Sequence, residues 1–512
     1  MRPRGPAMPY SAVEAALGYL ESHVERTKAR LVELVRIPSV SAEGFPPGEV
    51  RRSAEATAGL LREAGLENVR LLEMPGQHPY VYGDWLRAAG APTLLVYGHH
   101  DVQPPGRPER WTTPAFEPAE RDGRLYGRGS VDDKGTFICH IAAVEAWLRA
   151  VGRLPLNLRF LIEGEEETGS EGLEPFLARH APMLAADVAV LADTGNFEVG
   201  HPALTYQLRG ICQVDVEVRC LQQPIHSGFW GGPVPDAVRI LTEMIAGLEA
   251  ADGGLAIPGL YEGVATTGRK QLRRIRALPF DEGKFRSSAA MKPGTRLVGE
   301  KAYSVYERLW TRPALTVIAL EAHKVHGSSN QILDAARARL SLRTVPEMDA
   351  AEAGRLLVKK LTTEPPAGAK VTARVTGTAA WWTTDPEGPA FEAARRALAA
   401  AFGREAAMIG AGGSIGFVQP FSDALGGVPC LLMGVEDPSS AIHSENESLH
   451  LGDFVNGMRA AVHLYDELAR APLARSGRRA REEAPRARAA KAGRGRPARR
   501  PTSRRKRAAA RR

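Results

Sequence analysis

The sequence is poor in cysteine and has no long apolar run. Its 512 residues include four cysteines, far apart and without a CxxC pair: Cys139, Cys212, Cys220 and Cys430. No disulfide framework is implied, and reduced thiols of this kind suit a cytoplasmic protein. No window approaches the roughly 18 apolar residues of a membrane-spanning helix. Because the first residues also lack the apolar stretch of a secretion signal, we expect a protein that is neither membrane-bound nor exported.

Outside one terminal segment the sequence also lacks an excess of basic residues. Residues 475–512 hold 17 Lys and Arg against 2 Glu, whereas the rest of the chain holds 50 basic and 57 acidic residues. The pI of about 9.3 is therefore a property of this basic segment. With almost nothing to bury, the chain is predicted to be disordered beyond about residue 473. The charge of this segment suits contact with nucleic acid or an acidic surface.

Three apolar segments end directly in residues that can bind a metal ion or move a proton. His99 and Asp101 follow the first, a run of glutamates follows the second, and Asp193 follows the third. The segments, residues 93–97, 156–162 and 188–192, have the composition of strands buried on both faces. In open α/β sheets the crevice outside the carboxyl ends of the strands is where ligands bind. The sequence therefore predicts an α/β sheet with a site at this edge.

One further acidic segment and one histidine join these candidates. Asp132 and Asp133 precede a predicted helix at 136–148, so either could also serve only as an N-cap. The run EGEEE at 163–167 would repel itself without cations, although Glu163 and Glu165 also fit a solvated loop. His443 lies just beyond a predicted strand at 428–433. Other helices are predicted at 11–35, 52–64 and 389–402.

The pattern of apolar residues changes between about residues 204 and 384. Apolar and polar residues alternate there, as in Val214 to Arg219 and Arg339 to Arg343, which predicts an antiparallel sheet with one wet face. Helices at 236–249 and 349–362 would cover its other face. We expect a separate α+β domain inserted into the first, and this domain carries His226 in a loop. The expected boundaries are 1–203 and 386–472 for the first domain, 204–385 for the insertion and 473–512 for the basic segment.

The candidates at the sheet edge are two imidazoles and four carboxylates: His99, Asp132, Glu166, Glu167, Asp193 and His443. This mixture of nitrogen and oxygen ligands suits zinc, manganese or cobalt better than calcium or copper. One carboxylate bridging two ions, each completed by one histidine and one further carboxylate, would use five of the six. The sixth would then be free to act as a base.

Seven motifs carry a specific resemblance. They are GHHDVQP at 98–104, GRGSVDDKG at 127–135, EGEEETGS at 163–170, ADTG at 192–195, HSGFWGG at 226–232, GGSIG at 412–416 and HSENE at 443–447. In order and spacing they resemble the dinuclear-metal peptidases, which include carnosinase-like dipeptidases, aminoacylases, acetylornithine deacetylase and glutamate carboxypeptidase. The resemblance implies a mostly parallel-sheet metallopeptidase catalytic domain with an inserted α+β lid or dimerisation domain, in a homodimer.

The resemblance also implies a role for each candidate. Two divalent ions, zinc foremost and manganese or cobalt as alternatives, would share Asp132, with the other ligands divided between them. The ligand set is His99 and Asp193 for one ion, and Glu167 and His443 for the other. Asp101 would orient the first histidine, and Glu166 would be the general base. His226 resembles the family's oxyanion-stabilising histidine, which is often supplied across a dimer.

On the substrate side, Arg343 matches the arginine that grips a free carboxylate. Ser414 and Asn330 match substrate-contacting positions, although the residues around both depart from the family pattern. Asp at 193 and the segment LTYQLRGICQVDVEV resemble the dipeptidase branch, so a dipeptide is the expected substrate. Two alternatives stay open: deacylation of an N-acyl amino acid, and a nucleic-acid-associated protein with a degenerate enzyme body.

Overall fold

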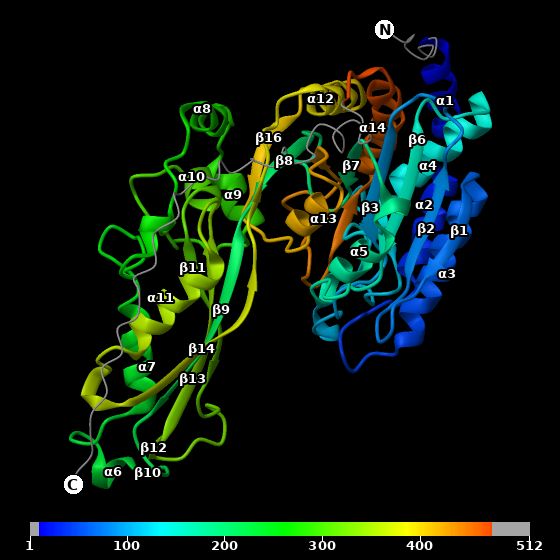
Figure 1. The fold of residues 1–512 in the computed structure, drawn as a ribbon. Helices are drawn as coiled ribbons and strands as arrows, with labels where there is room; N and C mark the ends of the chain where they lie inside the picture. The colour runs from blue at the N-terminus through cyan, green and yellow to red at the C-terminus, as the bar shows by residue number, and fades with distance from the viewer. Residues whose placement is uncertain (1–9, 474–512) are drawn as a thin grey trace, which may run out of the picture.

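The structure is a computed structural model that describes residues 10–473. The basic segment and the disorder predicted for it lie outside these residues. Within the described part of the chain, no helix is long and apolar enough to cross a membrane. Two separate sheets organise the chain, and Figure 1 shows them in different lobes.

The larger sheet has nine strands in the order β1-β2-β6-β3-β7-β17-β8-β15, with β16 paired to β8. The neighbours β6, β3, β7 and β17 at its centre run parallel. These central strands are apolar and largely buried, as expected for strands covered on both faces. The strand bounds are β1 Glu67–Leu72, β2 Tyr80–Trp85, β3 Thr93–His99, β6 Asn157–Glu163, β7 Val188–Leu191, β8 Ala203–Leu208, β15 Trp382–Thr383, β16 Ala407–Ala411 and β17 Cys430–Leu432.

Helices cover this sheet on both faces. Leu94 and Val96 of β3 belong to a core that includes residues of the terminal helices, whereas Leu95 and Tyr97 pack into a second core with α5 and α13. This division follows from the alternation of side chains along a strand. The helices are α1 Tyr10–Ser22, α2 Val24–Val35, α3 Pro47–Ala64, α4 Lys134–Val151, α12 Pro389–Phe402 and α14 Leu451–Arg470 on one face, and α5 Leu173–Leu184 and α13 Val418–Ala424 on the other.

The smaller sheet is antiparallel, with the strand order β11-β13-β9-β14. The helices α7 and α11 pack on one face and bury Val214, Val216 and Leu340 beneath them. The opposite face carries the polar residues, as the alternation predicts. The elements are β9 Gly210–Arg219, β11 Ala314–Glu321, β13 Ala335–Thr344, β14 Lys370–Ala379, α7 Ala237–Ala246 and α11 Ala350–Thr362.

The chain passes between the two sheets at Arg209. The preceding strand, β8, belongs to the large sheet, and β9 of the small sheet begins at Gly210. The chain returns to the large sheet from β14 to β15, which pairs with β8.

The remaining strands and α-helices are short. They are β4 Ala119–Arg121, β5 Arg124–Tyr126, β10 Ile225–His226, β12 Gln331–Ile332, β18 Ser448–His450, α6 Ser227–Trp230, α8 Arg269–Ala277, α9 Glu282–Ser288 and α10 Val305–Trp310.

Some elements differ from the sequence prediction. The helix predicted over 11–35 is two helices, interrupted at His23, whose side chain hydrogen-bonds back to the carbonyl of Tyr19. The strand predicted over 428–433 is shorter, from Cys430 to Leu432. Strands β1 and β2, which pair antiparallel at one edge of the large sheet, were not predicted at all.

Candidate metal centre and active site

The parallel strands deliver their last residues to one edge of the large sheet. In the register of β3 with β6, His99 is opposite Glu163, and in that of β3 with β7, Tyr97 is opposite Leu191. Asp193, two residues beyond Leu191, therefore reaches the level of His99. This convergence is what the carboxyl ends of neighbouring parallel strands predict.

Two groups of three side chains meet at this edge and share one carboxylate. In the first group His99 Nε2 lies 3.0 Å from Asp132 Oδ1 and 3.7 Å from Asp193 Oδ1. In the second, His443 Nε2 lies 3.0 Å from the other oxygen of Asp132, Oδ2, and 3.1 Å from Glu167 Oε2. Within each group the ligand atoms all lie within 4.8 Å of one another, a geometry that could hold a metal ion. We call these groups the His99 triad and the His443 triad.

Asp101 holds both triads in place. Its Oδ1 lies 3.4 Å from Nδ1 of His99, and its backbone carbonyl lies 3.1 Å from the same nitrogen. These contacts favour a proton on Nδ1 and leave Nε2 free as a ligand. The same carboxylate accepts hydrogen bonds from the Ser41 hydroxyl at 2.6 Å and from the backbone amides of Glu166 and Glu167 at 3.3 and 3.1 Å. One buried carboxylate therefore links the first histidine to the glutamate segment.

Asp133 does not act as the N-cap that its position allows. It occupies the cap position of α4, but its side chain makes no capping hydrogen bond. Instead its Oδ2 accepts from the backbone amide of His99 at 3.0 Å. Asp133 thus fixes the backbone of a triad residue.

Glu447 is a residue of the site that the sequence reasoning missed. Its Oε1 accepts hydrogen bonds from the amides of Gly129, Val131 and Asp132 at 3.1 to 3.2 Å, and its Oε2 pairs with Arg128 at 2.5 Å. This buried ion pair therefore shapes the turn that presents the shared carboxylate. The signal was present in the HSENE motif, four residues after His443.

The site gathers several buried carboxylates whose negative charges cations would neutralise. Burial and the charge of Asp132 raise the pKa of Glu167 to about 7. Burial and the charge of Asp193 raise the pKa values of Glu166 and of Glu436 well above the ordinary range. Glu436, which was also not predicted, adds another carboxylate to the group. Carboxylates gathered in this way repel one another, and two divalent cations would relieve the repulsion. Two imidazole nitrogens and several carboxylate oxygens fit such ions.

The sequence allowed Glu163 and Glu165 to belong to a solvated loop. For Glu163 this interpretation is wrong, because its side chain is buried. Its carboxylate is fully buried and accepts from the Tyr97 hydroxyl at 2.6 Å. Glu165 is half-buried and accepts from the backbone amide of His78 at 2.7 Å. The first of these two glutamates therefore belongs to the core beneath the site.

Burial raises the pKa of Glu163 to about 8, and this predicts a pH-dependent stability. In the unfolded chain the pKa is near 4.5, so between these values the folded state binds one more proton and loses stability as pH rises. Glu163→Gln, which does not titrate, should remove this loss. From pH 5 to pH 8 the free energy of unfolding of the unsubstituted chain should fall relative to the variant by roughly 3–5 kcal/mol. Denaturant unfolding at both pH values tests this, and parallel profiles would contradict it.

The other predicted residues are not brought to the triads of their own chain. His226 is exposed on β10, and Asn330 lies beside it, its carbonyl accepting from the amide of Ser227 at 2.9 Å. Both residues lie near the end of β9 that is distant from Arg209. The ten residues of this strand span roughly 33 Å, which separates the two residues from the end of the strand next to the large sheet. Arg343 and Ser414 do meet, with 2.7 Å between Nη1 and Oγ.

Comparison with known proteins agrees with this geometry. Residues 95–467 match the model of peptidase family M20/M25/M40. The cysteinylglycine-S-conjugate dipeptidase of Corynebacterium striatum is 36% identical over 361 residues, which cover 70% of this chain and 77% of that protein. The solved structure of human carnosine dipeptidase 1 has a TM-score of 0.79 at 27% identity, covering 91% of this chain and 100% of that one.

A second solved structure, the di-peptidase Dug1p of Saccharomyces cerevisiae, gives a TM-score of 0.79 at 25% identity and covers 90% of this chain and 99% of its own. The family match extends from the strand that delivers His99 to the helix beyond His443, so it includes both triads. The chain therefore belongs to peptidase family M20/M25/M40 and is a metallopeptidase.

Proposed function

We propose that this enzyme hydrolyses the amide bond of dipeptides that have a free carboxyl terminus. The observation that carries the proposal is the pair of triads joined by Asp132, with Glu166 beside them. Zinc is the proposed ion at both positions, with manganese or cobalt as alternatives. The names of the relatives, which are dipeptidases, support this substrate class.

The residues would divide the chemistry as follows. Bound divalent ions would polarise the scissile carbonyl and make the attacking water more acidic. His99, Asp132 and Asp193 would hold one ion, and Glu167 and His443 would join the shared aspartate at the other. Glu166 takes the proton from the water and returns it to the leaving amine. Asp101 fixes the orientation of the His99 ring and the position of the Glu166 backbone through its hydrogen bonds to both.

Deacylation of an N-acyl amino acid is the alternative reaction. It needs the same metal centre but no pocket for a free amino terminus. Incubation of the protein with zinc or manganese and two matched panels, of dipeptides and of N-acetyl amino acids, separates the two. Turnover of the acetylated panel alone would overturn the dipeptidase proposal.

Arg343 is proposed to bind the carboxylate of the substrate. It is half-buried, and its charge is not paired with an acidic group among the described residues. A lysine cannot form the two parallel hydrogen bonds of a guanidinium with a carboxylate. Arg343→Lys should therefore raise the KM for a dipeptide by roughly 10-fold or more, and leave slow hydrolysis of its C-terminal amide almost unchanged. Equal losses on both substrates would show that the arginine supports the fold instead.

The exposed position of His226 supports the proposal of a homodimer in which this histidine serves the partner's site. The neighbouring Phe229 and Trp230 are 82% and 54% exposed, which is unusual for large apolar side chains. His226→Ala and Glu166→Gln should each be nearly inactive alone. When the two are mixed and allowed to exchange subunits, half of the dimers hold one complete site, so about a quarter of the unsubstituted activity should return. No recovery, with exchange shown by mass spectrometry, would contradict the proposal.

Three further proposals concern the domains of the chain, its basic segment and its location. The sequence predicted an insertion at 204–385, but β8 and β15 belong to the large sheet, so we propose boundaries near Arg209 and residue 380 instead. The catalytic domain then surrounds the large sheet and the inserted domain the small one. The charge of residues 475–512 supports contact with nucleic acid or an acidic surface. A cytoplasmic location is proposed from the free cysteines.

A further inference from the structure

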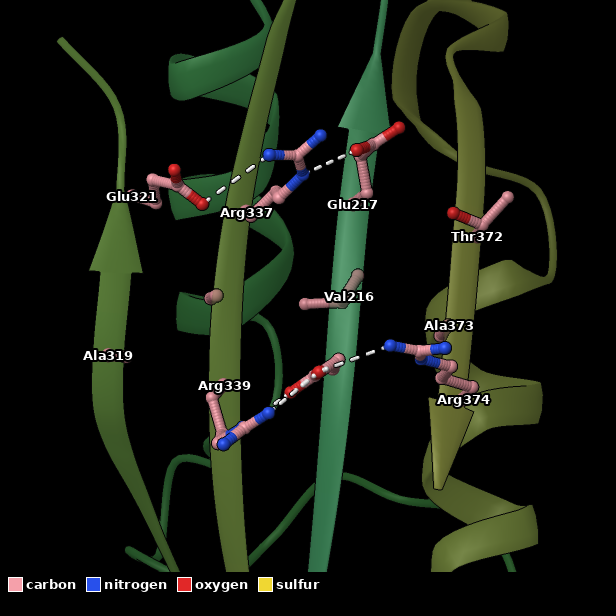
Figure 2. A pocket seen from close by; sticks show the side chains of 11 residues that line it. Val216, Glu217, Ala319, Glu321, Arg337, Arg339, Thr372, Ala373 and Arg374 are labelled. Atoms are coloured by element: carbon pink, nitrogen blue, oxygen red, sulfur yellow. Dashed lines mark hydrogen bonds and ion pairs between the residues drawn. The ribbon is translucent and has the colours of Figure 1, made fainter. Parts of the chain in front are cut away.

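The open face of the small sheet carries arginines that are matched with carboxylates across neighbouring strands. Arg337 of β13 is in register with Glu217 of β9, and 2.5 Å separates Nε from Oε2. Arg339 is in register with Asp215, at 2.6 Å. Figure 2 shows both arginines reaching across to the neighbouring strand. The charges of these two arginines are therefore neutralised within the sheet.

This matching ends at Arg343. Its register partner on β9 is Ile211, which has no charge. Continuing the alternation of β9 by two residues reaches Arg209, so the two arginines come to the same face. Arg209 is only 7% exposed, and its Nε donates to the carbonyl of Gly412 at 2.8 Å. Arg343 donates to Ser414 in the same glycine-rich loop.

No acidic group in residues 10–473 pairs with either arginine. Burial and the charge of Arg343 lower the pKa of Arg209 to about 10, so the side chain is still protonated at neutral pH. Two charges taken partly out of water and repelling one another are unfavourable unless an anion binds between them. The terminal nitrogens of Arg209 make no hydrogen bond within the described part of the chain, so they are available to a carboxylate.

We propose that Arg209 and Arg343 together form a two-arginine site for the C-terminal residue of the substrate, and that this site favours residues with a second carboxylate. The proposal rests on the dipeptidase function, because it assigns Arg209 to the carboxylate end of that substrate. The α-carboxylate of any dipeptide neutralises one of the two arginines. A C-terminal Asp or Glu also neutralises the second, which its neutral isosteres Asn and Gln cannot do.

The test compares kcat/KM for Ala-Asp and Ala-Asn. The unsubstituted enzyme should prefer Ala-Asp by about 10-fold or more, the factor expected for one additional hydrogen-bonded charge pair. Arg209→Met keeps an unbranched apolar stem and removes the charge, so it should abolish the preference by raising the KM for Ala-Asp about 10-fold more than the KM for Ala-Asn. Arg209→Lys should retain part of the preference. Arg339→Met removes a matched charge from the same face and should leave the preference intact.

Two results would overturn the proposal: no preference for Ala-Asp in the unsubstituted enzyme, or equal losses on both substrates in Arg209→Met. The second result would make Arg209 a support of the Gly412 loop only. If no dipeptide is hydrolysed at all, the proposed function fails, and the site is then tested by binding. Succinate should raise the melting temperature of the unsubstituted protein more than succinamate does at equal ionic strength, and Arg209→Met should abolish the difference. Equal shifts from both ligands would overturn the two-arginine site by itself.

Discussion

Glu166→Gln is expected to lower kcat by about 10²–10⁴-fold while leaving the bound metal nearly unchanged. The amide keeps the shape of the carboxylate but cannot accept the proton of the attacking water. Glu166 belongs to neither triad, so its replacement removes no ligand. Burial and the charge of Asp193 raise the pKa of Glu166, which makes its carboxylate a stronger acceptor for the proton of the attacking water. Steady-state kinetics with metal analysis of the same sample tests both halves of this expectation.

Glu165→Gln is the matched control, because the two glutamates are adjacent and undergo the same change. Glu165 accepts a hydrogen bond from the amide of His78 and has no contact with the triads. Its replacement should alter kcat by less than about 10-fold, as for a residue outside the proton transfer. Normal turnover in Glu166→Gln together with a collapse of turnover in Glu165→Gln would show that Glu165, and not Glu166, is the general base.

The sequence was sufficient to predict much of the large sheet because its central strands are short apolar runs with an abrupt polar end. A strand such as Thr93–His99 is recognisable from its own residues, and the carboxyl ends of parallel neighbours must meet. The strand ends alone bring His99 and Asp193 together, whereas the division of all five proposed ligands between two ions came from the family resemblance. The grouping in the structure, two triads that share Asp132, is the one that the family resemblance implied.

What could not be predicted depends on contacts between distant segments. Glu447 lies more than 300 residues from Arg128, and nothing in either local sequence reveals their ion pair. The burial of Glu163 depends on the hydroxyl of Tyr97 from the neighbouring strand. Strands β1 and β2 could not be predicted from their own residues. β1 is an edge strand in which polar and apolar residues are mixed, and β2 contains Gly83 and Asp84 among its apolar residues.

The bridging role of Asp132 leads to the second large effect. Its two oxygens face different histidines, Oδ1 towards His99 and Oδ2 towards His443, each at 3.0 Å. Asp132→Ala removes a ligand from both triads at once, so the variant should bind neither ion tightly. His443→Ala removes a ligand from one triad only and should weaken mainly one ion. Because altering even an outer partner of a ligand costs about 10–100-fold in metal affinity, loss of a shared ligand should exceed 100-fold at each position.

Metal analysis after gel filtration should find two ions per chain in the unsubstituted enzyme, one in His443→Ala and fewer than one in Asp132→Ala. Thermal melting separates metal loss from misfolding, because an ion that binds only the folded state stabilises it by RT ln(1 + [M]/Kd), about 2.7 kcal/mol at 100 times Kd. With chelator, the melting temperature of Asp132→Ala gives the metal-free baseline, which contains both the lost repulsion on Asp193 and Glu167 and the lost hydrogen bonds to His99 and His443. With zinc, only the unsubstituted chain should gain the full stabilisation. Two ions retained in Asp132→Ala would show that the triads do not share this ligand, and the dinuclear assignment would fall.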